Sequence, residues 1–235
     1  MNLEKYQQYS RIARGLEKAD LVLKDARIVN VFTEEIIRGD IAIQDGIIAG
    51  IGSFHGKEER DLAGRYVCPG FIDSHLHLES TLVTPAELVT VASRHGTTTF
   101  IVDPHESANV SGLAGIDYIL DQTEDVKANV YVMMPSCVPA TAIDDNGCTL
   151  TAEDMAPYLH NSRILGLGEV MDSISVVQGE KSMHDKLELF EGRIRDGHAP
   201  FLEEGDLQAY AMAGIATDHE CSFFDYAMRE RRNGL

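Results

Sequence analysis

The sequence lacks the features that mark secreted, membrane and nucleic-acid-binding proteins. Its first residues, MNLEKYQQYSRIARG, are too polar for a secretory signal, and no apolar run is long enough to span a bilayer. Basic residues are scarce, with 20 Lys and Arg against 38 Asp and Glu, and the net charge of -18 repels phosphate backbones and anionic lipid surfaces. We therefore expect a cytoplasmic protein that binds neither nucleic acid nor membrane.

Cysteine is also scarce, and its spacing is uninformative. Cys68, Cys137, Cys148 and Cys221 form no C-x-x-C pair, which suits reduced thiols better than disulfides or a structural zinc site. A glycine-rich phosphate loop is absent as well, which disfavours a dinucleotide-binding sheet. With 44% hydrophobic residues in a length of 235, the chain can nevertheless form an ordinary globular core.

Two sequence patterns divide the chain. Residues 1–19 have the pattern of a polar amphipathic helix, and residues 20–65 alternate apolar and polar positions between Gly and Asp turns. The second stretch predicts a small antiparallel β domain. In residues 66–235, apolar strands alternate with helical segments such as PAELVTVASRHG and GLAGIDYILDQTEDV. That alternation predicts a parallel α/β sheet.

Six strand candidates occur in this region, and each ends in a polar or reactive residue. Those endings are His77, His105, Cys137, Glu169, His198 and His219. The steps between them, of 28, 32, 32, 29 and 21 residues, match a βα unit of about 30 residues. In a TIM-type (β/α)8 barrel such strand ends converge on one site, whereas a doubly wound open sheet spreads them along a crevice. We predict an α/β fold of the barrel type, with about six strands present.

The strand-end residues have the chemistry of a metal site. His75 and His77, in FIDSHLHLES, lie on the same side of a strand because alternate residues share a face. Glu169 interrupts the apolar strand ILGLGEVM, where a carboxylate needs a cation. His198 and His219 end two later strands, although either alone could be a hydrogen-bonded core histidine. Imidazoles with a carboxylate suit Zn, Mn or Fe(II) better than Mg or Ca, so we predict a metal-dependent hydrolase.

The sequences of these motifs resemble those of a known family. The segments PGFIDSHLHLEST, HGTTTFIVDPHESANVSG, MMPSCVPAT, LGLGEVM, DGHAP and AGIATDHEC resemble the amidohydrolase superfamily and, within it, the adenine deaminases. The resemblance implies a (β/α)8 barrel with a small β-sandwich domain and a two-metal centre. It also implies a small-molecule purine substrate, with adenine and water converted to hypoxanthine and ammonia.

Carried over position by position, the resemblance implies a ligand set for two divalent ions, manganese or iron ahead of zinc. His75 and His77 would bind one ion, and His198 and His219 the other. Glu169 would bridge the two ions. Many relatives bridge with a carbamylated lysine, whereas Glu169 supplies two oxygens directly.

The catalytic candidates are Glu169, at the centre of the ligand set, and His105, in VDPHES. His105 could polarise the substrate or shuttle a proton, and the alternative is a structural contact with Asp103 or a nearby loop. Ser136, in PSCVPAT, is predicted to bind substrate as a hydrogen-bonding group of the base pocket. We expect Cys137 to be a small buried hydrophobe there.

The chain is short for the fold it predicts. A complete barrel needs about 250 residues, whereas residues 66–235 supply 170. Two strands of a complete barrel are therefore missing from this sequence. The aspartate that the family places at the end of the eighth strand is missing with them. The sequence thus resembles an N-terminal portion of a family member. Because an unclosed barrel leaves unpaired strand edges, we expect a homo-oligomer, weak metal binding and slow or absent adenine turnover. The alternatives are another amidohydrolase that opens cyclic amides, or a non-catalytic partial barrel that serves as a subunit.

Overall fold

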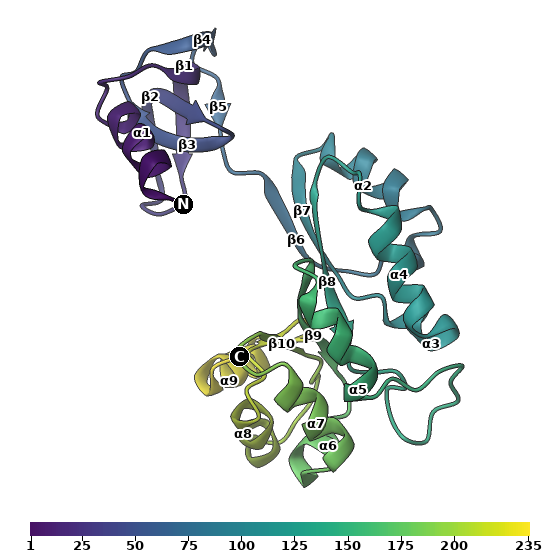
Figure 1. Ribbon diagram of the computed structural model, residues 1–235. Coiled ribbons are helices and arrows are strands. Elements are labelled where there is room, and N and C mark those ends of the chain that lie inside the picture. The colour runs from purple at the N-terminus through teal and green to yellow at the C-terminus, as the bar shows by residue number, and fades with distance from the viewer. The chain divides into compact units, whose positions relative to one another are not determined.

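The computed structural model describes residues 1–235, and the chain divides into two compact units, Met1–Pro69 and Gly70–Leu235. Figure 1 traces both units along the chain. None of the helices combines the length and the apolar character that crossing a bilayer requires.

The first unit is one mixed sheet with a single helix. Its elements are α1 (Leu3–Ala13), β1 (Ala19–Asn30), β2 (Glu35–Gln44), β3 (Ile47–Gly52), β4 (Gly56–Asp61) and β5 (Tyr66–Val67). Strand β2 pairs antiparallel with β1 and β3, but β4 and β5 both run parallel to β1. The predicted small β domain is present, but the prediction that it is antiparallel is wrong for β4 and β5. After β3 the chain crosses to the far side of β1 before it pairs again, so no hairpin links β3 to β4.

Local sequence explains the elements of this unit. The side chain of Asn2 caps α1 by accepting a hydrogen bond from the backbone nitrogen of Lys5 at 2.9 Å. Asp45 and Gly46 both have positive φ, of 50° and 74°, as the two-residue turn between β2 and β3 requires. The helix packs on the sheet through a buried apolar cluster that includes Ile12.

The second unit is a curled sheet of six parallel strands. The strands are β6 (Phe71–Leu76), β7 (Thr97–Val102), β8 (Asn129–Pro135), β9 (Ile164–Val170), β10 (Ile194–Gly197) and β11 (Thr217–Asp218). They lie side by side in chain order, and every neighbouring pair is parallel. This arrangement confirms the predicted α/β fold with six strands of a TIM-type barrel. Strands β6 and β11 form the two edges of the sheet.

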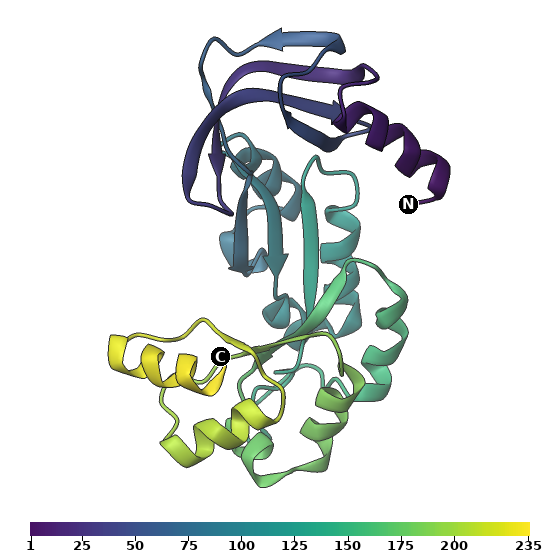
Figure 2. The same cartoon turned by 90° about the vertical axis from the view of Figure 1, so that its left-hand side faces the viewer.

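Helices connect the strands and lie along the outer side of the sheet, as Figures 1 and 2 show. They are η1 (Glu79–Thr81), α2 (Pro85–Ser93), α3 (His105–Ser111), α4 (Leu113–Gln122), α5 (Ala152–Met155), η2 (Ala156–His160), α6 (Ser173–Gln178), α7 (Lys181–Leu189), α8 (Glu204–Met212) and α9 (Phe224–Asn233). One continuous apolar core holds helices and strands together, with Phe100, Ile116, Met134 and Leu167 fully buried in it. This core positions the strand ends that carry the candidate site.

The inner face of the curled sheet contains a hollow of about 270 Å³. Apolar side chains from the four inner strands line part of it, among them Ile101, Met133 and Leu165. Polar side chains line the rest, including those of His75, Asp196 and His219. The polar end of the hollow therefore belongs to the site described next.

Candidate metal centre

The strand ends bring the predicted ligands and His105 together. These residues come from five different strands or the turns that follow them: His75, His77, His105, Glu169, His198 and His219. Each of the five imidazoles has a ring nitrogen within 4 Å of the Glu169 carboxylate. Parallel strands explain this convergence, because their carboxyl ends meet at one edge of the sheet.

Three imidazoles face one oxygen of Glu169. The Nε2 atoms of His75 and His77 lie 2.9 Å and 3.0 Å from Oε1, and Nε2 of His219 lies 3.6 Å from the same atom. The rings of His75 and His219 stack with centroids 3.6 Å apart. Nδ1 of His77 lies 2.7 Å from the backbone oxygen of Asp103, which fixes that nitrogen as the donor. Nε2 of His77 is therefore free for a metal ion.

The other oxygen of Glu169 faces a second set of groups. Nδ1 of His105 lies 3.4 Å from Oε2, and Nδ1 of His198 lies 3.8 Å from it. Asp103 adds a carboxylate on this side, with Oδ1 at 3.5 Å from Nδ1 of His105. The two oxygens of Glu169 thus face different sets of nitrogen atoms.

The backbone at Glu169 is unusual and specifically supported. Its φ of 29° lies where residues other than glycine are rare. Its carbonyl oxygen accepts hydrogen bonds from the Ser136 hydroxyl at 2.7 Å and from the nitrogen of Met171 at 2.8 Å. The preceding residue must be glycine, because a Cβ at Gly168 would lie 1.9 Å from Oδ2 of Asp103. These contacts aim the Glu169 side chain into the centre.

The hydroxyl of Ser136, predicted to contact substrate, contacts the protein backbone in the structure. The residue is fully buried, and its hydroxyl is committed to the Glu169 carbonyl oxygen. Its own carbonyl oxygen accepts a hydrogen bond from the buried Lys186 ammonium at 2.8 Å. Ser136 therefore positions Glu169. Cys137 beside it is also buried.

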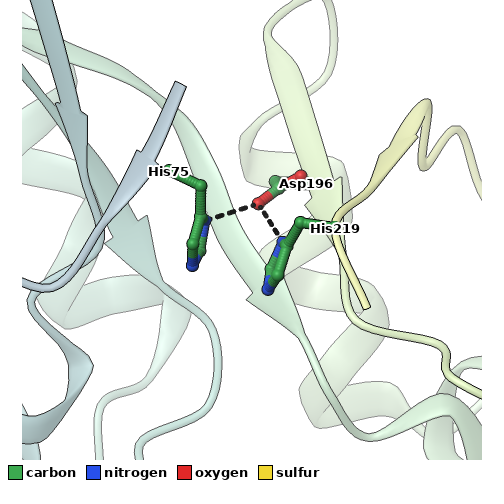
Figure 3. Close-up of side chains that lie close together, drawn as sticks. All are labelled: His75, Asp196 and His219. Carbon is green, nitrogen blue, oxygen red and sulfur yellow. Dashed lines mark ion pairs between the residues drawn. The ribbon is translucent and has the colours of Figure 1, made fainter. Parts of the chain in front are cut away.

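Two acidic members of the centre, Asp103 and Asp196, were not among the predicted site residues. Asp196 lies on β10, with Oδ2 at 3.5 Å from Nδ1 of His75 and 3.3 Å from Nδ1 of His219. Figure 3 shows one oxygen of its carboxylate paired with both rings. The signal was present in the sequence, since Asp196 precedes His198 by two residues and so repeats the same-face spacing of the H-x-H pair.

In the metal-free centre, neighbouring charges shift the pKa values of His75, His77 and Glu169 toward their charged forms. Burial acts to lower the pKa of His75, but contacts with Asp196 and Glu169 outweigh it and raise that pKa to about 10. The contact with Glu169 raises the pKa of His77 to about 9, against the effect of burial. Burial acts to raise the pKa of Glu169, but His75 and His77 hold it well below its usual range. Protons on the imidazoles thus balance the carboxylates.

The residues present fit a divalent metal ion. Buried atoms without a hydrogen-bond partner gather here, namely both carboxylate oxygens of Asp103, Oε2 of Glu169, and Nδ1 of His105, His198 and His219. The carboxylates of Asp103, Glu169 and Asp196 form ion pairs only with histidines, and none pairs with Lys or Arg. Buried carboxylates need a compensating cation, and nitrogen with oxygen donors suits a divalent transition metal.

Metal binding is expected to release protons. An imidazole must lose its proton to coordinate a metal, and the pKa values of His75 and His77 are about 10 and about 9. A metal ion therefore competes with protons at neutral pH, so affinity should rise between about pH 6 and pH 9, with about two protons released per protein at pH 7. Calorimetric titrations in buffers of different ionisation enthalpy measure this number. Affinity that is independent of pH over this range would contradict the assignment of His75 and His77.

The same shift has an opposite consequence for the metal-free fold. Because the folded pKa of His75 is raised above its ordinary value of 6.5, its contribution to stability is complete below that pH and is lost as the pH rises through about 10. The metal-free and metal-loaded proteins should therefore respond to alkaline pH in opposite directions.

Comparison with known proteins places these residues in a family. The sequence model of the amidohydrolase family matches residues 66–232, a range that includes Glu169 and the five histidines around it. The chain belongs to the amidohydrolase family. The matched range covers the H-x-H pair at the end of β6 and the polar residues at the ends of the strands that follow.

Curated relatives resemble the chain in sequence, and a solved structure resembles it in fold. Adenine deaminase of Desulfitobacterium hafniense is 57% identical over 100% of the chain and 41% of the relative. Adenine deaminase of Clostridium acetobutylicum is 48% identical over 95% of the chain and 40% of the relative. The chain thus spans about two fifths of the length of these relatives, as expected for a portion of a longer family member. The crystal structure of 5-methylcytosine deaminase from Klebsiella pneumoniae shares the fold, with a TM-score of 0.55 at 15% identity over 91% of this chain and 64% of that one.

Proposed function

We propose that this chain carries the metal centre of an adenine deaminase, which converts adenine and water to hypoxanthine and ammonia. The observation that carries the proposal is the position of Glu169, whose two oxygens face different sets of imidazoles. A buried carboxylate between two sets of nitrogen donors suits a pair of neighbouring cations. The curated relatives described above are named adenine deaminases, which supports adenine as the substrate.

The proposed ligands divide between two divalent ions. His75 and His77 would hold one ion, and His198 and His219 the other, with Glu169 between them. The ligand atoms support this division, because those of His75, His77 and Glu169 lie within 4.8 Å of one another, as do those of Glu169, His198 and His219. Nε2 of His219 also lies 3.6 Å from Oε1 of Glu169, the oxygen that His75 and His77 face, so His219 is close to the ligands of both proposed ions.

Charge and donor chemistry support the number and identity of the ions. Three carboxylates meet in the centre, those of Asp103, Glu169 and Asp196. A single divalent ion would leave them undercompensated, whereas two ions offset them. Burial raises the pKa of the Cys137 thiol well above its ordinary value, so the donors are imidazole and carboxylate. That mixture favours manganese or iron(II) ahead of zinc.

The chain's own groups would handle the protons. A divalent ion, when bound, supplies Lewis-acid activation of water near neutral pH. Burial acts to lower the pKa of His105, but Asp103 and Glu169 outweigh it and raise that pKa. His105, whose pKa these contacts raise, is the group we propose to pass a proton to the leaving group. In the overall reaction the water oxygen bonds to C6 of adenine, the C6–N6 bond breaks, and N6 leaves as ammonia.

An assay of the purified protein with Mn²⁺ and adenine tests the proposal. We expect slow, metal-dependent release of ammonia together with hypoxanthine, because the inner face of the sheet is open along both edge strands. Chromatography of the products and a coupled ammonia assay measure the rate, and a chelator should abolish it. Metal-loaded protein that neither binds adenine nor releases ammonia would contradict adenine as the substrate.

The same assay separates the competing functions. Faster turnover of a cyclic amide than of adenine would favour another amidohydrolase activity. The unpaired edges of β6 and β11, with Phe71 and Ile72 exposed on β6, support a homo-oligomer as the form in solution.

A further inference from the structure

One carboxylate links imidazoles from the two opposite edges of the sheet. His75 belongs to β6 and His219 follows directly on β11, and these are the edge strands. Asp196, on β10, places the single oxygen Oδ2 at 3.5 Å from one imidazole and 3.3 Å from the other. Its side chain is 14% exposed, and Figure 3 shows the carboxylate lying against both rings.

The ring nitrogens decide whether Asp196 acts as a metal ligand or as a support. Asp196 approaches the Nδ1 atoms of His75 and His219, whereas the Nε2 atoms of both rings face Oε1 of Glu169. A neutral imidazole has one lone pair and one N–H. If Nε2 supplies the lone pair on the Glu169 side, Nδ1 carries the hydrogen on the side where Asp196 lies, at 3.5 Å from His75 and 3.3 Å from His219, which are ion-pair distances and not hydrogen bonds.

We infer that Asp196 is a positioning residue that keeps His75 and His219 in the tautomer with Nε2 free to bind metal. A carboxylate on the far nitrogen of a ligating histidine fixes its tautomer and ring orientation and strengthens it as a ligand. This inference rests on the proposed metal-dependent function of the same site. The inference adds that a single carboxylate, that of Asp196, orients one ligand of each proposed ion, namely His75 and His219.

Thr217 supports the orientation of the aspartate. Its hydroxyl donates a hydrogen bond to Oδ1 of Asp196, which leaves Oδ2 for the two imidazoles. Thr217 therefore contacts Asp196, and Asp196 in turn contacts the candidate ligands His75 and His219. Thr217→Val should weaken metal binding in the same direction as a change at Asp196, but by less.

The test is the variant Asp196→Asn in the full chain. Asparagine keeps the size of the side chain but removes its charge, and it turns one oxygen into an amide that donates. We expect Zn²⁺ affinity to fall by about 10- to 100-fold with the number of bound ions unchanged. Competition titration against a chelator gives affinity and stoichiometry. Long-range ¹H–¹⁵N spectra of the Zn²⁺-loaded protein should show the Nδ1–H tautomer at His75 and His219 in the wild type, and its loss from at least one ring in the variant.

Controls separate positioning from general damage. Asp185→Asn, on α7, removes an aspartate that pairs with Lys181 and should leave affinity and tautomers unchanged. Circular dichroism of the metal-free variants checks folding, and Thr217→Val replaces Asp196→Asn if the latter fails to fold.

Each outcome is informative. Unchanged affinity and tautomers in Asp196→Asn would overturn this inference alone, and loss of one whole equivalent of Zn²⁺ would overturn it in favour of Asp196 as a direct ligand. A wild-type protein that binds no Zn²⁺ would instead overturn the proposed function, and this inference with it.

Discussion

Replacement of Glu169 by glutamine is expected to lower divalent-metal affinity by more than about 100-fold. This loss is larger than the one expected when a residue that only supports a metal ligand is replaced. The carboxylate contacts five imidazoles and carries the charge that a cation needs at the centre. An amide in its place is neutral, and its NH₂ group faces nitrogen lone pairs on one side. Metal analysis after gel filtration and competition titration measure the loss. Ammonia release from adenine should disappear with it.

A carboxylate elsewhere in the same unit provides the control. Glu188 lies exposed on α7, and Glu188→Gln makes the same chemical change away from the histidines. That variant should bind metal like the wild type. If Glu169→Gln bound metal as tightly as Glu188→Gln, Glu169 would have no place at the centre of the site.

Replacement of Phe100 by alanine is expected to lower the free energy of unfolding of the second unit by about 3–5 kcal/mol. Phe100 lies on β7, is 1% exposed and belongs to the main apolar core. Alanine would leave a cavity between the sheet and its helices, because close-packed neighbours relax only in part. Urea unfolding of the metal-free protein, followed by far-ultraviolet circular dichroism, measures the change.

The matched control is Phe224→Ala. Phe224 begins α9 and is 78% exposed, so its truncation should change the free energy of unfolding by less than about 1 kcal/mol. Similar losses for the two variants would mean that the core does not lie between β7 and the helices.

Much of the fold of the second unit could be predicted because its signals are local. Apolar runs such as ILGLGEV, bounded by helical segments, predict parallel strands, and all six were confirmed. The convergence of His75, His77 and Glu169 follows from the same pattern, because parallel strands end at one edge. Here local sequence and tertiary structure agree.

The features that sequence did not predict depend on contacts between distant segments. The parallel pairing of β4 with β1 is set by where the chain returns, and no local residue encodes that path. The commitment of the Ser136 hydroxyl to the Glu169 carbonyl joins β8 to β9 and depends on a backbone φ of 29°. The spacing of Asp196 from His198 indicated that the two share a face of the strand. Its contacts with His75 and His219 could not be predicted, because they depend on the tertiary arrangement of β6 and β11.

The placement of the candidate ligands on β6 and β11 has a mechanical consequence. These strands are the outermost of the sheet, and their imidazoles stack with centroids 3.6 Å apart. An ion bound there would cross-link the first and last strands of the unit, so that metal loading and the curvature of the sheet become one coupled equilibrium. Removal of the metal by a chelator would then loosen the whole curled sheet. Hydrogen exchange of the backbone amides in β6 and β11 would report how much metal the protein holds.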